Sequence, residues 1–225
     1  MLIIDFVMVY PLFKRTLGLY LSLYLKEVKG IEKIPKEGPF IIAANHESHI
    51  DPFLLGVIVV LNLNKKLYFL TRFGSREGNT GLFSKVTLFF VRPILVNWFG
   101  CIPVLKKGGS VEASVSLLKK GGIIGIYPEG RRNPSNTLLE PKTGVAAIAL
   151  LSKAPVVPIG IIRSHRILPI GAIFPRFTRA TIKIGKPITF DNYYGKEKDR
   201  NILKKVTNTV MLEIAKLCGK KYVTL

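Results

Sequence analysis

Short apolar runs alternate along the chain with longer apolar or amphipathic stretches. Short runs typical of buried strands occupy residues 40–44, 67–71, 102–105, 123–127, 156–162 and 180–184. Longer stretches with helical spacing, one interrupted by a proline, occupy residues 52–63, 82–99, 110–120, 142–152 and 199–217. Because the two kinds of segment alternate, the pattern predicts an α/β fold with a mainly parallel mixed sheet flanked by helices.

The N-terminal stretch is apolar but does not have the pattern of a membrane-spanning helix. Residues 6–25 contain Pro11, Lys14 and Arg15 near their middle, and each central charge costs roughly 2.5–3.5 kcal/mol in a spanning helix. Aromatic and apolar residues recur there at helical spacing, which predicts a helix lying in the membrane interface. The alternative is a helix packed on the protein's own core. We therefore divide the chain into an N-terminal interfacial helical segment, residues 1–29, and an α/β domain, residues 30–225.

The chain is strongly basic and also hydrophobic. It has 34 basic and 14 acidic residues, a formal charge of +20, 48% hydrophobic residues and a mean hydropathy of +0.31. This combination suits a protein on an anionic membrane surface, where each basic group contributes about 1 kcal/mol. Nucleic acid is not an expected partner, because the basic residues are dispersed and no nucleic-acid motif occurs. A solvated basic surface, as in heat-adapted proteins, is the remaining explanation.

The expected location is the cytoplasmic face of the cell membrane, with peripheral or monotopic attachment. The first residues lack the basic stretch of a secretory signal. The two cysteines lie in apolar surroundings and form no metal-binding or disulfide pattern, which favours a reducing compartment.

The most informative motif is a histidine and an aspartate at a predicted strand-to-helix junction. Asn45, His46, Ser48 and Asp51 follow the apolar run at residues 40–44 and precede an apolar helix. An imidazole oriented by a carboxylate is the minimal general base. Taken alone, His46 would be interpreted as a surface-loop histidine.

A second motif follows the strand predicted at residues 123–127, and it contains Pro128, Glu129, Gly130 and Arg132. Together the two motifs resemble the N-H-x-S-x-x-D and F-P-E-G-x-R blocks of the glycerolipid acyltransferase superfamily, whose best-known members are PlsC-type lysophosphatidate acyltransferases. Weaker matches to the family's other two blocks begin at Gly100 and Val157, and the resemblance covers residues 30–187. The chain departs from the family with Tyr127 in place of Phe, Lys106 in place of Arg, and Arg131 and Asn133 in place of Thr and Ser.

The resemblance implies transfer of a fatty acyl group from a thioester to the free hydroxyl of lysophosphatidic acid, giving phosphatidic acid. His46 would remove the hydroxyl proton, and Asp51 would hold the second ring nitrogen. The chain has no G-x-S-x-G nucleophile motif, and the acceptor hydroxyl itself serves as nucleophile. The residues expected to bind substrate are Asn45, Ser48, Arg72, Lys106, Glu129, Gly130, Arg132 and Lys142. For Glu129 the alternative is a salt bridge that only fixes its loop.

The sequence leaves several points open. We expect no cofactor and no metal; the acyl donor is a substrate, carried either on coenzyme A or on acyl carrier protein. The acceptor is a lysophospholipid, although glycerol 3-phosphate or another lysolipid would fit the same motifs. Two other possible functions are a hydrolase that passes the acyl group to water and a non-catalytic basic protein that binds membranes or RNA. The intact motifs disfavour the non-catalytic protein, because a protein that binds through its positive charge alone needs neither motif.

Overall fold

The computed structural model describes residues 16, 18–71, 101–103, 109–172 and 174–224. The strands are β1 (Leu25–Lys29), β2 (Phe40–Ala44), β3 (Leu67–Thr71), β4 (Cys101–Pro103), β5 (Ile123–Ile126), β6 (Val156–Ile162) and β7 (Ala180–Ile184). The helices are α2 (Asp51–Leu63), α4 (Ser110–Lys119), α5 (Gly144–Ser152), α6 (Ser164–Ile167) and α7 (Arg200–Cys218), with 3-10 turns at Ile31–Lys33 and Asp191–Tyr193. The helix predicted at residues 82–99 lies outside the described residues.

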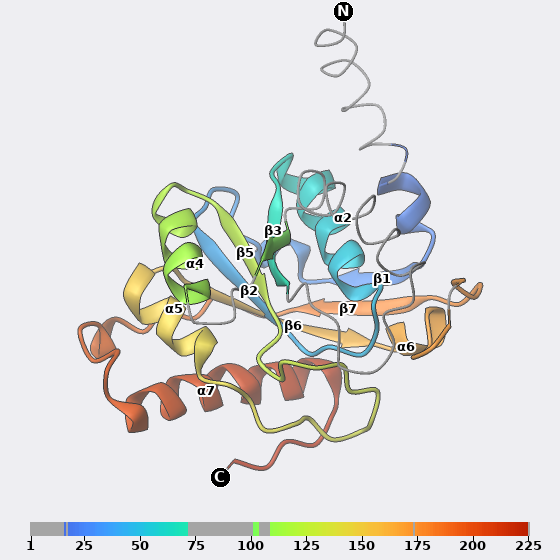
Figure 1. Cartoon of the computed structure of the whole chain (residues 1–225). Helices are drawn as coiled ribbons and strands as arrows, with labels where there is room; N and C mark the ends of the chain where they lie inside the picture. Colours follow the sequence, from blue (N-terminus) through green and yellow to red (C-terminus); the bar gives the residue numbers. More distant parts are fainter. Residues whose placement is uncertain (1–15, 17, 72–100, 104–108, 173, 225) are drawn as a thin grey trace, which may run out of the picture.

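The strands form one sheet in the order β1-β7-β6-β2-β5-β3-β4 (Figure 1). The central strands β6, β2, β5, β3 and β4 are parallel to one another. β7 is antiparallel to β6, and β1 is parallel to β7. The predicted α/β fold with a mainly parallel mixed sheet is therefore confirmed.

The start of the chain differs from the prediction at residues 25–29, which were assigned to a helical segment. Residues 16 and 18–22 are helical, but Leu25–Lys29 form the edge strand β1 beside β7. The sequence Leu-Lys-Glu-Val-Lys has only two apolar residues, a composition common in edge strands, where charge prevents further pairing. Residues 1–15 lie outside the described part, so the predicted interfacial helix stays a prediction there.

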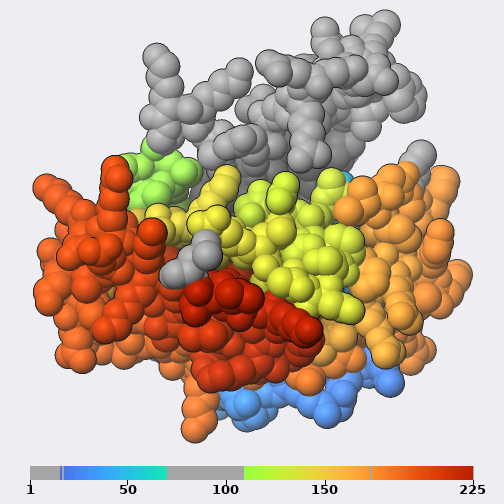
Figure 2. Space-filling view, turned by 90° about the horizontal axis from the view of Figure 1, so that it is seen from below, coloured from blue at the N-terminus to red at the C-terminus, as the bar shows by residue number. Residues whose placement is uncertain are grey.

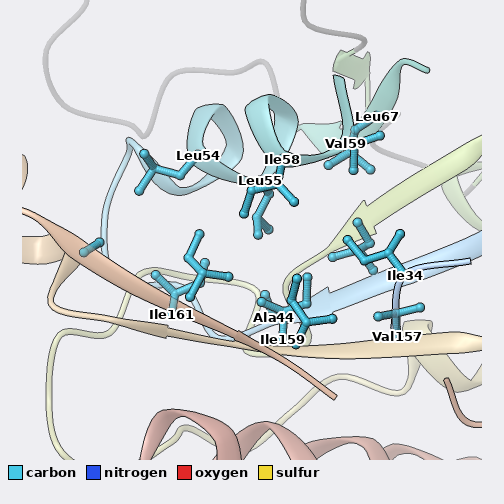
Figure 3. Packing of buried hydrophobic residues seen from close by; sticks show 14 of the residues in the cluster. Ile34, Ala44, Leu54, Leu55, Ile58, Val59, Leu67, Val157, Ile159 and Ile161 are labelled. Carbon is cyan, nitrogen blue, oxygen red and sulfur yellow. The ribbon is translucent and has the colours of Figure 1, made fainter. Parts of the chain in front are cut away.

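One face of the sheet is covered by α2. Leu54, Leu55 and Ile58 of this helix pack onto alternate residues of the central strands, including Ala44 and Ile161 (Figure 3). The helix is apolar on nearly all sides, as expected for a buried element. This packing fixes the position of the first residue of α2, Asp51, relative to the end of β2.

Helices α4, α5 and α7 lie on the opposite side of the sheet from α2 (Figure 1). Ile41 and Ala43 of β2 point into this second layer, whereas their neighbours Phe40 and Ile42 point toward α2, as the two-residue period of a strand requires. Residues on both faces are buried, which accounts for the continuously apolar strands.

The starts of α4 and α7 are capped in different ways. Gly109, with a φ of 82°, lies just before Ser110, the first residue of α4. Glycine adopts this left-handed conformation readily, so the chain turns into the helix without a side-chain cap. In α7, Asp199 lies just before the helix and accepts hydrogen bonds from the backbone amides of Asn201 and Ile202. In the described part of the chain, no helix has the length and apolar character needed to cross a bilayer.

The contact between β6 and α7 gives a test of this packing. A Cβ atom added at Gly160 would lie 2.5 Å from the backbone nitrogen of Cys218, so Gly160→Ala must push the helix from the sheet. We expect a loss of about 1–3 kcal/mol in the free energy of unfolding, measured by urea denaturation. Gly56→Ala in α2 is the matched control, because a Cβ there meets no atom within 4 Å among the described residues outside its own helix. The control should be stabilised by up to about 1 kcal/mol; equal effects of the two substitutions would contradict the packing.

Candidate active site

The residues of both motifs lie at one edge of the sheet, in loops except for Asp51, which is the first residue of α2. His46 follows β2, Glu129 follows β5 and Ser164 follows β6. Because these three strands are adjacent and parallel, their carboxyl ends meet at the same edge, where open α/β sheets usually bind ligands.

His46 and Asp51 form a hydrogen-bonded pair. The Nδ1 atom of His46 lies 2.8 Å from Oδ2 of Asp51, and the backbone amides of Glu47 and Ser48 donate to the same oxygen at 2.8 Å. The Asp51 side chain is fully buried, whereas that of His46 is 16% exposed. Since the carboxylate only accepts hydrogen bonds, Nδ1 carries the proton, and Nε2 is left with a lone pair that can accept one.

An aromatic stack supports the imidazole. The ring of His46 lies 4.0 Å from that of Tyr127, and Tyr127 in turn stacks on Phe69 at 5.6 Å. Burial and, to a smaller extent, the nearby Asp51 charge raise the pKa of the Tyr127 phenol well above its ordinary value. Among the described residues, neither the Tyr127 hydroxyl nor Oδ1 of Asp51 has a hydrogen-bond partner. Tyr127 therefore contributes a flat, neutral surface against which the imidazole is held.

Glu129 connects the two motifs. Its Oε1 accepts from the His46 backbone amide at 3.2 Å, and its Oε2 accepts from Asn133 Nδ2 at 2.9 Å and from the Leu139 amide at 3.0 Å. The His46 carbonyl accepts from the Asn133 amide. Both carboxylate oxygens are thus bonded to the protein itself, and Glu129 is 4% exposed. This geometry makes Glu129 a brace between the loops; its predicted contact with substrate stays a prediction.

The side chains of Asn45 and Ser48 also form hydrogen bonds with other parts of the protein. The Asn45 side chain exchanges two hydrogen bonds with the backbone of Ile161, at 2.7 and 2.8 Å. The Ser48 hydroxyl donates to the Leu168 carbonyl at 2.6 Å. Both side chains are buried, so they join the His46 loop to β6 and to the segment after α6.

The predicted basic residues fall into two groups. Arg72 and Lys106 lie outside the described residues. Arg132 directly precedes Asn133, whose backbone amide donates to the His46 carbonyl. Partial burial and, to a smaller extent, the positive charge of Arg132 lower the pKa of His49. Lys142 lies against Gly130: its backbone amide donates to Pro128, and a Cβ on Gly130 would lie 3.0 Å from its side chain. Gly130 has a φ of 67°, so glycine suits this turn for conformational and steric reasons.

A buried ionic cluster, which the sequence pattern did not predict, lies next to the site. Glu47 accepts from His165 Nδ1 at 2.9 Å and pairs with Lys220 Nζ at 2.8 Å. The Glu47 and Lys220 side chains are 2% and 8% exposed. Only the position of Glu47 beside His46 could have suggested a role, because His165 and Lys220 are more than a hundred residues away in sequence.

Lys220 also joins the C-terminal segment to the second motif. Its Nζ donates to the Asn133 carbonyl at 3.1 Å, and the Leu138 amide donates to the Lys221 carbonyl at 2.8 Å. Figure 2 shows this C-terminal segment, in red, lying against the yellow-green segment that follows β5. The end of the chain therefore helps the sheet to hold two loops beside His46: the one that contains Glu47 and the one that contains Asn133.

The chemistry of the site follows from this arrangement. A partly exposed imidazole, oriented by a buried carboxylate, is suited to take a proton from a bound hydroxyl or water. Within the described residues, no group of three or more His, Cys, Asp or Glu side chains could hold a metal ion. The positive charge beside the imidazole favours an anionic substrate.

The contribution of the Glu47–Lys220 pair to stability can be tested. Lys220→Met removes one partner from the buried Glu47 carboxylate and should lower the free energy of unfolding by about 3 kcal/mol. This value is at the lower end of the range for breaking a buried ion pair, because His165 remains in contact with Glu47. Lys216→Met is the control, because Lys216 pairs with Glu213 on the surface, with 70% of its side chain exposed. The control should lose no more than about 1 kcal/mol. Denaturant unfolding that gives equal losses would show that the buried pair is not structurally important.

Comparison with known proteins agrees with this geometry. The chain is 25% identical over 158 residues to a chloroplastic 1-acyl-sn-glycerol-3-phosphate acyltransferase of Brassica napus, covering 66% of this chain and 40% of the relative. It is 30% identical over 139 residues to the 1-acyl-sn-glycerol-3-phosphate acyltransferase of Bacillus subtilis, covering 59% of this chain and 60% of the relative. The chain thus spans about half the length of these curated relatives.

A solved structure and a family profile extend the comparison. The fold matches the 1-acyl-sn-glycerophosphate acyltransferase PlsC from Thermotoga maritima with a TM-score of 0.62 and 18% identity, over 92% of this chain and 81% of the other. The profile of the family described as Acyltransferase matches residues 26–162, which is more than half of the chain and includes both motifs. On this evidence the chain belongs to the acyltransferase family.

Proposed function

We propose that this protein is a 1-acyl-sn-glycerol-3-phosphate O-acyltransferase. It transfers a fatty acyl group from a thioester to the free hydroxyl of lysophosphatidic acid and gives phosphatidic acid. The observation that carries the proposal is the 2.8 Å contact between His46 Nδ1 and the buried Asp51 carboxylate at the sheet edge. Family membership and the names of the relatives support the choice of reaction and acceptor.

The mechanism begins with the acceptor hydroxyl beside His46. Nε2 takes the hydroxyl proton as the oxygen attacks the thioester carbonyl carbon, and Asp51 stabilises the imidazolium that forms. The new C–O bond forms, the C–S bond breaks, and the leaving thiolate takes the proton from the imidazolium. The substrate hydroxyl is the nucleophile, so no acyl-enzyme intermediate is required.

The acceptor phosphate needs cations held near the imidazole. Arg132 is the first choice, because the adjacent Asn133 amide is bonded to the His46 carbonyl at 2.6 Å and guanidinium groups bind phosphate bidentately. Lys142, beside Gly130, is the second. Arg72 and Lys106 stay predicted contributors. Asn45, Ser48 and Glu129 act mainly by holding the loops in place.

The acceptor is a lipid, so the enzyme works at a membrane. The net charge of +20 favours peripheral or monotopic attachment to an anionic surface, and the cytoplasmic face is the proposed side. The donor is acyl-CoA or acyl-carrier protein, and nucleic acid is not a partner.

The first test of this proposal replaces the base. His46→Ala should reduce kcat roughly 10²- to 10⁴-fold, the usual contribution of a general base, with little change in vesicle binding. His49→Ala is the matched control, because His49 is the nearest other histidine, is exposed and is not needed by the mechanism. Transfer that persists in His46→Ala, or that is lost equally in His49→Ala, would show that the general-base assignment is wrong.

The second test concerns the acceptor. Purified protein in detergent should form phosphatidic acid from labelled acyl-CoA or acyl-carrier protein and lysophosphatidic acid, and little product with glycerol 3-phosphate or uncharged lysolipids. Arg132→Ala should raise the KM for lysophosphatidic acid about tenfold or more, because a charge-assisted phosphate contact is lost. Product from another lysolipid alone would change the acceptor and keep the mechanism. Release of free fatty acid without any transfer would indicate a hydrolase.

A further inference from the structure

Large apolar side chains are exposed in the segment between α6 and β7. Phe177 is 99% exposed, Phe174 80% and Ile170 57%. Single exposed apolar residues are common on soluble proteins, but three within eight positions form a concentration that needs explanation. Residues 168–179, which we name the aromatic loop, contain all three.

The base of the aromatic loop is tied to the protein. The Arg176 amide donates to the Ile167 carbonyl at 2.7 Å, and the Ala172 amide donates to the Pro169 carbonyl at 3.0 Å. The Leu168 carbonyl accepts from Ser48, within the His46 motif. The loop therefore begins at the candidate active site and extends outward from a fixed base.

The charged side chains within this stretch of sequence are all basic. Arg163, Arg166, Arg176 and Arg179 are all exposed, and no acidic residue occurs in the sequence between Glu140 and Asp191. Aromatic rings flanked by arginines are typical of surfaces that bind the headgroup region of anionic bilayers.

The aromatic loop lies near both the candidate active site and the N-terminal helical turn. β7 is antiparallel to β6, so the start of β7 lies at the sheet edge where β6 and β2 end. The Ala180 amide donates to the Tyr24 carbonyl at 2.8 Å. This contact brings the loop close to the helical turn at residues 18–22, which bears exposed Leu19, and to exposed Leu23 just after it. Figure 1 shows the blue helical turn and the orange segment near α6 at the same side of the molecule.

We propose that the aromatic loop is a membrane-contact element that inserts Phe174 and Phe177 into the headgroup region of an anionic bilayer. The four arginines bind lipid phosphates, and the helical turn at residues 18–22 lies on the same surface. This orientation places the His46 edge of the sheet toward the lipid, where a lysophospholipid acceptor would enter. That last consequence rests on the proposed function, whereas the membrane contact itself does not.

The test is flotation of the full chain with phosphatidylcholine vesicles, with and without phosphatidylglycerol. The double variant Phe174→Ser/Phe177→Ser should bind the anionic vesicles about tenfold or more weakly than the unaltered chain, because it lacks the two rings that insert into the bilayer. Leu212→Ser is the control, because Leu212 is an exposed apolar residue on α7, the helix on the face of the sheet away from α2. This variant should bind the vesicles as the unaltered chain does. Arg176→Gln/Arg179→Gln should reduce the preference for phosphatidylglycerol.

A parallel assay separates this proposal from the proposed function. Transfer to a short-chain, dispersed lysophosphatidic acid should be unchanged in the double phenylalanine variant, while transfer to vesicle-bound acceptor should fall. Vesicle binding that is equal in the double variant and the unaltered chain, or absent from both, would overturn the loop's role. An unaltered chain that binds vesicles through the loop but transfers nothing would overturn the proposed function alone.

Discussion

The arrangement of the candidate site depends on one buried oxygen atom, Oδ2 of Asp51. It accepts hydrogen bonds from the Glu47 and Ser48 amides and from the His46 ring. These contacts shape the turn between β2 and α2 and set the orientation of the imidazole at once. A carboxylate buried without such donors would be strongly unfavourable, so the turn, the start of α2 and the tautomer of His46 are specified together.

The remainder of the fold holds this oxygen and its partners in place. The apolar face of α2 fixes Asp51 above the sheet (Figure 3), and the Tyr127 ring limits the tilt of the imidazole. Glu129 and the Glu47–Lys220 pair hold the loops on each side of His46. Catalytic groups positioned by such supporting contacts react from a prepared geometry. Several motif residues therefore serve the reaction through positioning.

Sequence patterns predicted the central strands and the His46–Asp51 pair well, because the information is local. Phe40–Ala44 and Val156–Ile162 are uninterrupted apolar runs, and the pair is separated by only five positions. The edge strand β1 was missed because its charged residues conceal the two-residue period. The contacts of Glu47 with His165 and Lys220 depend on packing between segments far apart in sequence. The hydrogen bonds of Glu129 could not be predicted either, because they depend on how its loop folds against the His46 loop.

The most direct test of the account is to observe which ring nitrogen of His46 carries the proton. The chain has three histidines, so ¹⁵N-labelled imidazole resonances can be assigned with His49→Ala and His165→Ala variants. In the neutral ring we expect the proton on Nδ1, with Nε2 unprotonated, and loss of this preference in Asp51→Ala. A proton on Nε2, or a tautomer ratio that is unchanged in the Asp51 variant, would contradict the claim that Asp51 prepares His46 as the base.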